Sequence, residues 1–277
     1  MTIATLIAAD PLNASHVEAL ARRHGAELHW HDERAARLRG VGDRLRADMD
    51  GMAADVIFHA GGRPALFLAD MDSTMIGQEC IDELAAEAGV GERVADITER
   101  AMRGELDFEG ALKERLALLE GLEDAVIDRL LATRIKPNDG ARRLVRTLQH
   151  HGVRTVLVSG GFTAFADRIG AQLGFDRVVA NRLGTVNGKL TGAVDGAIVD
   201  GAVKQATLEA ERAKVGGPVI AIGDGANDLP MLGAADLGIA YRAKPKVAAA
   251  ADARLDHAPL DALLWIFDIA REDWLTD

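Results

Sequence analysis

Two aspartates, Asp70 and Asp72, stand directly after the apolar run 65–69. An apolar run that ends abruptly in polar residues is typical of a strand buried on both faces of a parallel sheet, where ligands bind at the carboxyl end. Alternation along the chain would aim both carboxylates at one side, and their repulsion would raise the pKa of one of them. Such a pair could hold a cation, or act as nucleophile and general acid. Taken alone, a solvated acidic turn is the simpler interpretation.

A second acidic group follows another apolar run. The run 218–222 predicts a buried strand, and the turn 223–228 after it contains Asp224, Asn227 and Asp228. Carboxylate oxygens are hard ligands of the kind that Mg²⁺ prefers, and the glycines of this turn allow close approach of the backbone. Because Asp70 and Asp224 would both lie at strand ends, we interpret the two acidic groups as parts of one site.

Two further features could bind a phosphate group. The run 154–158 predicts a strand, and Ser159, Gly160 and Gly161 follow it directly before a helix. A hydroxyl and backbone N–H groups at the start of a helix can converge on an oxyanion, although this turn by itself is a weak signal. Lys204 precedes the predicted helix 206–215, where the helix dipole alone would not favour a cation. A lysine at that point could neutralise a phosphoryl oxygen.

The elements that must position these residues form an α/β pattern. Between the strands at 65–69 and 154–158, the sequence predicts a bundle of short helices over 79–88, 91–103, 107–119 and 123–132. Lying over the carboxyl end of the first strand, the bundle would act as a lid that excludes water and supplies specificity contacts. The remaining elements are a helix over 141–151, β-structure within 178–201 with an Asn187-Gly188 hairpin turn, a strand over 237–240 and a terminal helix over 263–274.

Two charged residues of the lid each have two interpretations. Glu79 begins the first helix, where it could favour the helix dipole or bind the ammonium group of a substrate. Arg115 lies beside Glu114 and could form a surface ion pair or contact a substrate. Phe108 and Cys80 are interpreted as core residues, and the Cys80 thiol as buried and inert.

Residues 1–62 carry no catalytic group. They predict a small β-α-β-α-β module with strands over 2–9, 27–32 and 55–59, a helix capped by Ser15 and a second helix over 42–53. The Gly- and Pro-rich segment 61–64 is interpreted as a link. His29 and His31 are interpreted as the solvent-facing side of an edge strand, because no third metal ligand lies at a suitable spacing.

Composition restricts the class of protein. The 277 residues are 48% hydrophobic and 27% charged, which is typical of a globular protein with one large or two moderate domains. The net charge of −11 argues against a nucleic-acid partner, so phosphate would have to be bound by local positive groups. With a single cysteine, no apolar run of membrane-spanning length and no secretory leader, we expect a cytoplasmic protein without a membrane partner. The oligomeric state stays open, and a homodimer is compatible with the sequence.

Four ordered groups of residues resemble the motifs of the haloacid dehalogenase-like phosphatases. They are 70–74, Ser159, Lys204 and 223–228, and the resemblance extends from about residue 64 to the C-terminus. Within that superfamily, the Asp-Met-Asp-Ser-Thr form of the first motif, Glu79, the helical insert and 159–162 are similar to phosphoserine phosphatases. Arg115 and Asn227 also fall where that family contacts its substrate.

The resemblance implies an α/β fold in three parts. A Rossmann-like parallel sheet would form the catalytic core from 63–76 and 135–277, and a helical-bundle cap, 77–134, would be inserted after the first core strand. Residues 1–62 are similar in position to the ACT-like region of bacterial phosphoserine phosphatases. Because they are shorter than two full ACT modules, a serine-sensing role stays open.

The resemblance also implies a reaction, the Mg²⁺-dependent hydrolysis of O-phospho-L-serine to L-serine and phosphate, the last step of serine biosynthesis. Asp70 would form an aspartyl-phosphate, and Asp72 would act as general acid and then as general base. Mg²⁺ would be held by the carboxylates of Asp70 and Asp224 and the backbone carbonyl of Asp72, with Asp228 orienting the metal or its waters.

The remaining roles are implied in the same way. Ser159, the Gly160 amide and Lys204 would bind the phosphoryl oxygens. Glu79 would take the ammonium group, Arg115 the carboxylate as a bidentate fork, and Asn227 would add a further substrate contact.

Two other functions compete with this one. The same chemistry could act on another small phosphomonoester, or transfer the phosphate to an alcohol such as homoserine. The other alternative is a non-catalytic amino-acid sensor built on the N-terminal module. All the expected catalytic positions are filled, which argues against a sensor without catalytic activity.

Overall fold

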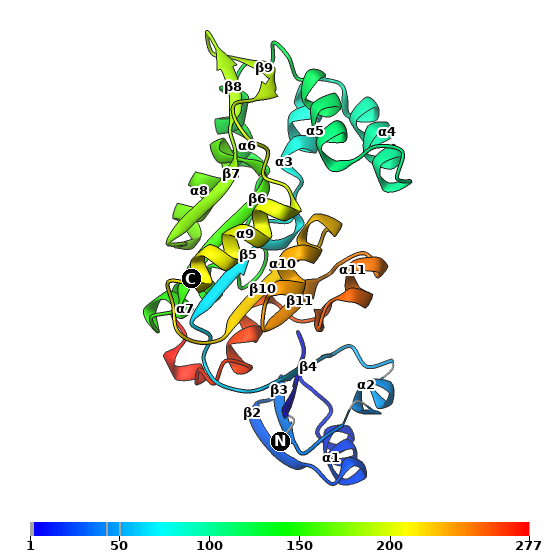
Figure 1. Ribbon diagram of the computed structural model, residues 1–277. Helices are drawn as coiled ribbons and strands as arrows, with labels where there is room; N and C mark the ends of the chain where they lie inside the picture. Colours follow the sequence, from blue (N-terminus) through cyan, green and yellow to red (C-terminus); the bar gives the residue numbers. More distant parts are fainter. Residues whose placement is uncertain (1–2, 43, 50, 277) are drawn as a thin grey trace.

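The computed structural model describes residues 3–42, 44–49 and 51–276, and Figure 1 shows them in three parts, one above another. A small α/β unit lies at the bottom of the view and a parallel sheet with its helices lies in the middle. A group of helices with a β-hairpin lies at the top. Within the described residues, no helix is long and apolar enough to cross a membrane.

The small unit is a four-stranded antiparallel sheet with the order β2-β3-β1-β4. Its elements are β1 (Ile3–Ile7), α1 (Ala14–His24), β2 (Glu27–Asp32), β3 (Ala35–Arg39), α2 (Arg44–Asp48) and β4 (Asp55–His59). Their succession is the ferredoxin-like βαββαβ order. Leu6, Leu20 and Leu38, from strands and helix, belong to an apolar core that is separate from those of the large sheet.

Three details of this unit differ from the sequence prediction. β3 was not predicted, because Ala-Ala-Arg-Leu-Arg favours helix, and it forms a strand because it pairs with β1 on one side and β2 on the other. α1 is capped by Asn13, whose side chain accepts the backbone N–H of His16, and not by Ser15. α2 is shorter than the expected 42–53, of which positions 43 and 50 lie outside the described residues.

The large sheet has six parallel strands in the order β12-β11-β10-β5-β6-β7. They are β5 (Leu66–Ala69), β6 (Arg154–Phe162), β7 (Arg177–Asn181), β10 (Val219–Gly223), β11 (Leu237–Tyr241) and β12 (Ala253–Leu255). β5 lies between β10 and β6, and all four of its residues are fully buried. The predicted parallel α/β sheet, with this strand inside it, is confirmed.

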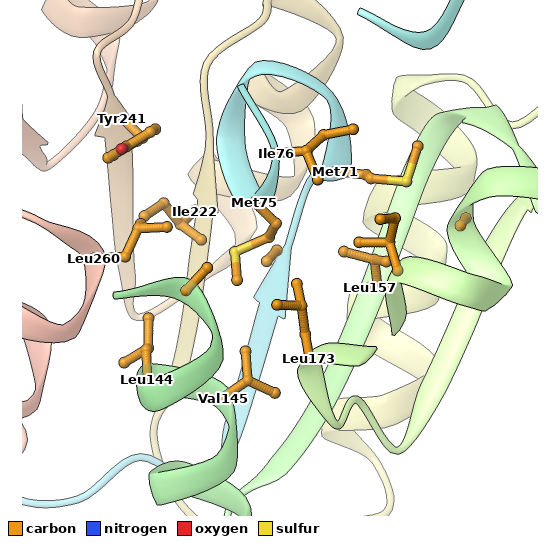
Figure 2. Close-up of a cluster of buried hydrophobic side chains, with 14 of the residues drawn as sticks. Met71, Met75, Ile76, Leu144, Val145, Leu157, Leu173, Ile222, Tyr241 and Leu260 are labelled. Atoms are coloured by element: carbon orange, nitrogen blue, oxygen red, sulfur yellow. The ribbon is translucent and has the colours of Figure 1, made fainter. Parts of the chain in front are cut away.

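Helices cover both faces of this sheet, and the alternation of side chains along β5 explains how. Phe67 and Ala69 belong to the apolar cluster on the side of α7 (Ala141–His150) and α8 (Thr163–Leu173), which Figure 2 shows in part. Leu66 and Leu68 point to the opposite side, where the covering helices are α9 (Gly201–Arg212), α10 (Leu229–Ala234) and α11 (Pro245–Ala250). A strand with two apolar faces is therefore held between two layers of helix.

The C-terminal helix expected over 263–274 is wrong. The structure has two short 3₁₀ helices, Leu260–Trp265 and Arg271–Asp273, joined by an irregular segment in which Asp268 has a positive φ of 57°. The apolar residues of this segment are buried against α7, but they do not lie along one face of an α-helix.

The helical group is inserted between β5 and α7. It contains α3 (Cys80–Glu87), α4 (Gly91–Met102), α5 (Phe108–Ala117) and α6 (Val126–Thr133), close to the four predicted segments. The hairpin β8 (Leu183–Val186) and β9 (Lys189–Val194) joins this group, because backbone bonds link Gly121 and Leu122 to Leu190. Its Asn187-Gly188 turn, with φ of 52° and 75°, confirms the predicted hairpin.

Candidate active site

Asp70 and Asp224 follow two adjacent strands of the large sheet. β5 and β10 pair in parallel with Ala69 opposite Ile222, so both aspartates leave the sheet at the same edge. The backbone N–H of Asp70 donates to the carbonyl of Ile222 at 3.0 Å, which fixes the start of the turn 70–76. The sequence prediction that the two acidic groups meet is confirmed by this register.

Three carboxylates and one ammonium group converge at this edge. Lys204 lies fully buried on α9, with its Nζ 2.7 Å from Asp70 Oδ1 and 2.6 Å from Asp228 Oδ1. Carboxylate oxygens of Asp70, Asp224 and Asp228 lie within 4.8 Å of one another. The helix that carries Lys204 begins at Gly201 and is capped by Asp200, earlier than the predicted 206–215, so that Lys204 lies in its first turn and faces inward.

The electrostatics of this cluster favour an added cation. Burial and the charge of Asp228 raise the pKa of Asp70, and burial and Asp228 raise the pKa of Asp224 to about 7. Burial acts to lower the pKa of Lys204, but the charges of Asp228 and Asp70 outweigh it and raise it. One lysine cannot balance three carboxylates, so the donor set fits a hard divalent ion such as Mg²⁺.

The hydrogen bonds indicate which oxygens remain available to such an ion. Asp228 is fully engaged, since Lys204 takes its Oδ1 and the backbone N–H groups of Asp224 and Gly225 donate to its Oδ2. Asp224 accepts the Thr74 hydroxyl on Oδ1 at 2.9 Å. Within the described part of the chain, the second oxygens of Asp70 and Asp224 accept no hydrogen bond. Gly223 is required here, because a Cβ on it would lie 2.5 Å from the Asp228 carboxyl carbon.

Asp72 lies in a different environment from Asp70. Its Oδ1 accepts the backbone N–H of Cys80 at 3.2 Å, and its Oδ2 lies so close to Gly161 that a Cβ there would be 2.5 Å away. Burial and the charge of Glu79 raise the pKa of Asp72 to about 7, while bonds from Cys80 oppose the shift. The prediction that Asp70 and Asp72 repel each other is therefore wrong. The like charge that raises the pKa of Asp70 most is Asp228, and the one that raises the pKa of Asp72 is Glu79.

The segment 159–161, near the end of β6, lies beside Asp72. Ser159 is buried at the end of the regular part of β6, and its Oγ accepts the backbone N–H of Gly161 at 2.8 Å, which leaves the hydroxyl proton free to donate. Asn181, at the end of β7, donates to the carbonyl of Gly160 at 2.7 Å and accepts the N–H of Val199. Asn181 was not predicted as part of the site, although a polar residue directly after the apolar run Val-Val-Ala is a signal for such a position.

The cap contributes a carboxylate and a guanidinium. Glu79 is the N-cap residue of α3 but makes no capping hydrogen bond, and its Oε1 instead accepts the hydroxyl of Ser73 at 2.7 Å. Arg115 is half-buried; burial lowers its pKa, and the charges of Asp82, Glu79 and Asp72 oppose this. The alternative of an Arg115–Glu114 surface pair is wrong, because Glu114 pairs with Arg100 at 3.0 Å.

Cap and core touch at the segment 159–161. The ring of Phe108 on α5 lies where a Cβ on Gly160 would come within 3.0 Å of it. The two connections between cap and core run side by side, with Ile76 paired to Pro137 in a short antiparallel bridge. Asn227 lies in the turn before α10 with its amide oxygen against Gly225, and its predicted substrate contact stays a prediction.

Comparisons with known proteins agree with this geometry. A family model described as haloacid dehalogenase-like hydrolase matches residues 67–233. Phosphoserine phosphatase from Streptococcus thermophilus is 48% identical over 206 residues, which cover 73% of this chain and 95% of that protein. Phosphoserine phosphatase from Streptomyces coelicolor is 47% identical over 236 residues, which cover 83% of this chain; the chain spans 57% of that longer relative.

Among solved structures, a probable phosphoserine phosphatase from Vibrio cholerae in unliganded form has a TM-score of 0.80 and 31% identity. The match covers 98% of this chain and 88% of that chain, so it includes the small N-terminal unit. Sequence, fold and the arrangement of acids around Lys204 lead to the same assignment. The chain belongs to the phosphoserine phosphatases of the haloacid dehalogenase-like hydrolases.

Proposed function

We propose that this chain hydrolyses O-phospho-L-serine to L-serine and phosphate through an aspartyl-phosphate on Asp70, the last step of serine biosynthesis. The observation that carries the proposal is the meeting of a buried carboxylate, Asp70, with Lys204 at 2.7 Å, next to a second acid, Asp72, whose pKa is raised to about 7 by burial and Glu79. The first arrangement suits a nucleophile beside an anionic phosphate. The second suits a group that gives and takes a proton near neutral pH.

The steps follow from these positions. A carboxylate oxygen of Asp70 attacks phosphorus while the bond to the seryl oxygen breaks, and protonated Asp72 gives its proton to that oxygen. Asp72, now ionised, takes a proton from the water that attacks the aspartyl-phosphate, which releases phosphate and restores Asp70. Ser159, the Gly160 amide and Lys204 bind the phosphoryl oxygens throughout.

The metal in this proposal is Mg²⁺. The free oxygens of Asp70 and Asp224 and the backbone carbonyl of Asp72 would hold it, and Asp228, occupied by Lys204 and two N–H groups, would orient the ion or its waters. When bound, the ion would reduce the electrostatic repulsion between the anionic nucleophile and the anionic phosphate.

The proposed substrate is a zwitterion, and the cap carries one group for each charge. Glu79 would bind the ammonium group and Arg115 the carboxylate, with Asn227 as a further contact. The two groups lie close enough to interact. Desolvation raises the pKa of Glu79, and the charge of Arg115 acts in the opposite direction.

We further propose that 63–76 with 135–277 act as the catalytic core, 77–134 as the cap and 1–62 as an ACT-like module. The βαββαβ order of the module supports the last assignment. A cytoplasmic location and a homodimer are proposed with it; the single cysteine supports a reducing compartment.

Phosphate release from O-phospho-L-serine, beside a panel of other phosphomonoesters and with homoserine as a trial acceptor, tests the reaction. We expect phosphoserine to be the preferred substrate, water the acceptor, EDTA to stop turnover and Mg²⁺ to restore it. Turnover that ignores chelation would refute the metal assignment, and a higher rate on another phosphomonoester would refute the substrate.

A further inference from the structure

Ser73 adopts a backbone conformation that a serine rarely takes. Its φ is 54° and its ψ is 1°, in the left-handed region where glycine is the favoured residue. It lies one residue after Asp72, inside the turn that Ile76 closes by donating its N–H to the carbonyl of Met71 at 3.0 Å. Glycine would meet the needs of this turn with less strain, so the serine side chain calls for an explanation of its own.

The hydroxyl supplies that explanation. Ser73 Oγ donates to Glu79 Oε1 at 2.7 Å, and the backbone N–H of Ser73 donates to the carbonyl of Gln78 at 3.2 Å. The two bonds join the turn that follows Asp72 to Gln78 and Glu79, the two residues before α3. A change in the position of Ser73 would therefore move the Glu79 carboxylate relative to Asp72.

Glu79 needs such a partner because it is exposed just before α3, where packing alone does not fix its side chain. Partial desolvation raises the pKa of Glu79, and the Ser73 hydrogen bond acts in the opposite direction, toward the ionised form. Within the described residues, the Ser73 hydroxyl is the one hydrogen-bond donor to the Glu79 carboxylate. A charged and fixed carboxylate at this place is what a substrate ammonium group would require.

We propose that Ser73 is a positioning residue that sets selectivity for phosphomonoesters bearing an ammonium group, by holding the Glu79 carboxylate beside the reaction centre. This inference rests on the proposed function, in which Glu79 binds the ammonium group of the substrate. Ser73 itself takes no part in phosphoryl transfer. Ser73 would increase the ratio of kcat/KM for substrates with the ammonium group to kcat/KM for substrates without it.

Two substitutions separate this role from a structural one. Ser73→Ala removes the hydroxyl and keeps a Cβ in the left-handed conformation, whereas Ser73→Gly removes the hydroxyl and relieves the backbone. Thr98→Ala is the matched control, because it deletes a cap hydroxyl that donates to the carbonyl of Val94 within α4, away from the site. The substrate pair is O-phospho-L-serine and 3-phosphooxypropanoate, which differ in the ammonium group alone.

We expect both Ser73 variants to lose about tenfold in kcat/KM on O-phospho-L-serine, mainly through a higher KM, because a hydrogen bond to a charged group is lost. Their kcat/KM on 3-phosphooxypropanoate should change by less than about twofold, and Ser73→Gly should melt no lower than the parent. In a Glu79→Gln background, Ser73→Ala should have no further effect on selectivity.

Each other outcome contradicts the inference. Equal losses on both substrates would assign Ser73 to the geometry of the turn 70–76, and unchanged selectivity in both variants would leave the hydroxyl without this role. A parent enzyme that does not prefer O-phospho-L-serine over its deamino analogue would overturn the proposed function and this inference together. If the parent enzyme prefers O-phospho-L-serine and the Ser73 variants keep that preference, only the role assigned to Ser73 is overturned.

Discussion

Asp70 and Asp72 are two positions apart in the chain, and their side chains lie in different surroundings. Asp70 faces a fully buried lysine at 2.7 Å, so its ionised form has a partner even before a metal ion is considered. Asp72 faces Glu79 and a glycine loop, where burial and a like charge favour its protonated form. These different environments support the proposal that one of two identical side chains acts as nucleophile and the other as proton donor.

Replacing the nucleophile should end turnover without unfolding the protein. Asp70→Asn keeps the shape of the side chain, and Lys204 remains paired with Asp228 at 2.6 Å, so no buried charge is left alone. We expect the rate of Mg²⁺-dependent phosphate release to fall by roughly a thousandfold or more, with a melting temperature at or above that of the parent. Substantial residual turnover in this variant would show that Asp70 is not the nucleophile.

Arg115 should matter for substrates with a carboxylate and little for others. Arg115→Ala is expected to lower kcat/KM on O-phospho-L-serine by roughly a hundredfold, because the carboxylate would lose its charged partner, and to change the value for p-nitrophenyl phosphate far less. Arg100→Ala is the matched control, since that cap arginine is paired with Glu114 on the surface. Similar losses on both substrates would remove Arg115 from the substrate pocket.

At the scale of elements, the site is made where strands and helices of the core meet the cap. The end of β5 supplies Asp70, the end of β10 supplies Asp224, and α9 brings Lys204 between them. The last residues of β6 lie against the site, with Gly161 beside Asp72 and Gly160 beside Phe108 of the cap. Because β6 comes so close to Asp72 and Phe108, positions 160 and 161 have no room for a side chain larger than that of glycine.

Gly161→Ala tests that requirement. The new Cβ would lie 2.5 Å from Asp72 Oδ2 and 3.0 Å from Ser159 Oγ, so the proton donor would have to move. We expect kcat on O-phospho-L-serine to fall by roughly a hundredfold, and less on p-nitrophenyl phosphate, whose leaving group needs little protonation. Gly216→Ala is the control, because a Cβ there meets nothing within 4 Å. If both variants keep full activity, the contact between this part of β6 and Asp72 is not tight.

At the scale of the whole molecule, the N-terminal unit is fixed to the core through polar contacts. The carboxylate of Asp55 on β4 accepts the backbone N–H groups of Asp256, His257 and Ala258 at 2.8 to 3.0 Å. Arg37 of β3, which is buried, binds Asp268 and the carbonyl of Trp265. The Arg37 contacts join the N-terminal unit to the irregular C-terminal segment.

Two histidines at this junction should make stability depend on pH. Burial, followed by the charge of Arg37, lowers the pKa of His59 and of His31 to about 4, although Asp268 acts in the opposite direction on both. His29 and Asp32 add smaller, opposed effects on His31. His59 uses both ring nitrogens, Nδ1 as acceptor from Gly61 and Nε2 toward the hydroxyl of Thr5, and protonation would break the first bond.

The sign follows from the two states. An unfolded histidine binds a proton near pH 6.5 and the folded one near pH 4, so stability is fully present above about 6.5 and is lost as pH falls toward 4. For His59 we expect a loss of about 1–3 kcal/mol in the free energy of unfolding, measured by urea titration at pH 7 and pH 4.5. His59→Gln should reduce this pH dependence, and His16→Gln, at an exposed position, should not. The same slope in parent and both variants would contradict the assignment.

The sequence alone determined the features that depend on local rules. Asp70, Asp224 and Ser159 could be placed at strand ends because a short apolar run followed by polar residues has one good interpretation in an α/β protein. The Asn187-Gly188 hairpin turn is likewise local, and it is present. These features require no knowledge of what packs against them.

The tertiary structure alone decided the rest, because it depends on neighbours that are distant in the chain. β3 is a strand only because β1 and β2 flank it, and Glu114 pairs with Arg100 rather than Arg115 because α4 lies beside α5. Asn181, from another strand, donates a hydrogen bond to the carbonyl of Gly160. The raised pKa of Asp72 comes from burial and from Glu79, neither of which spacing reveals. Burial and charge are properties of the folded surroundings, so a motif can name a catalytic residue without stating which proton it carries.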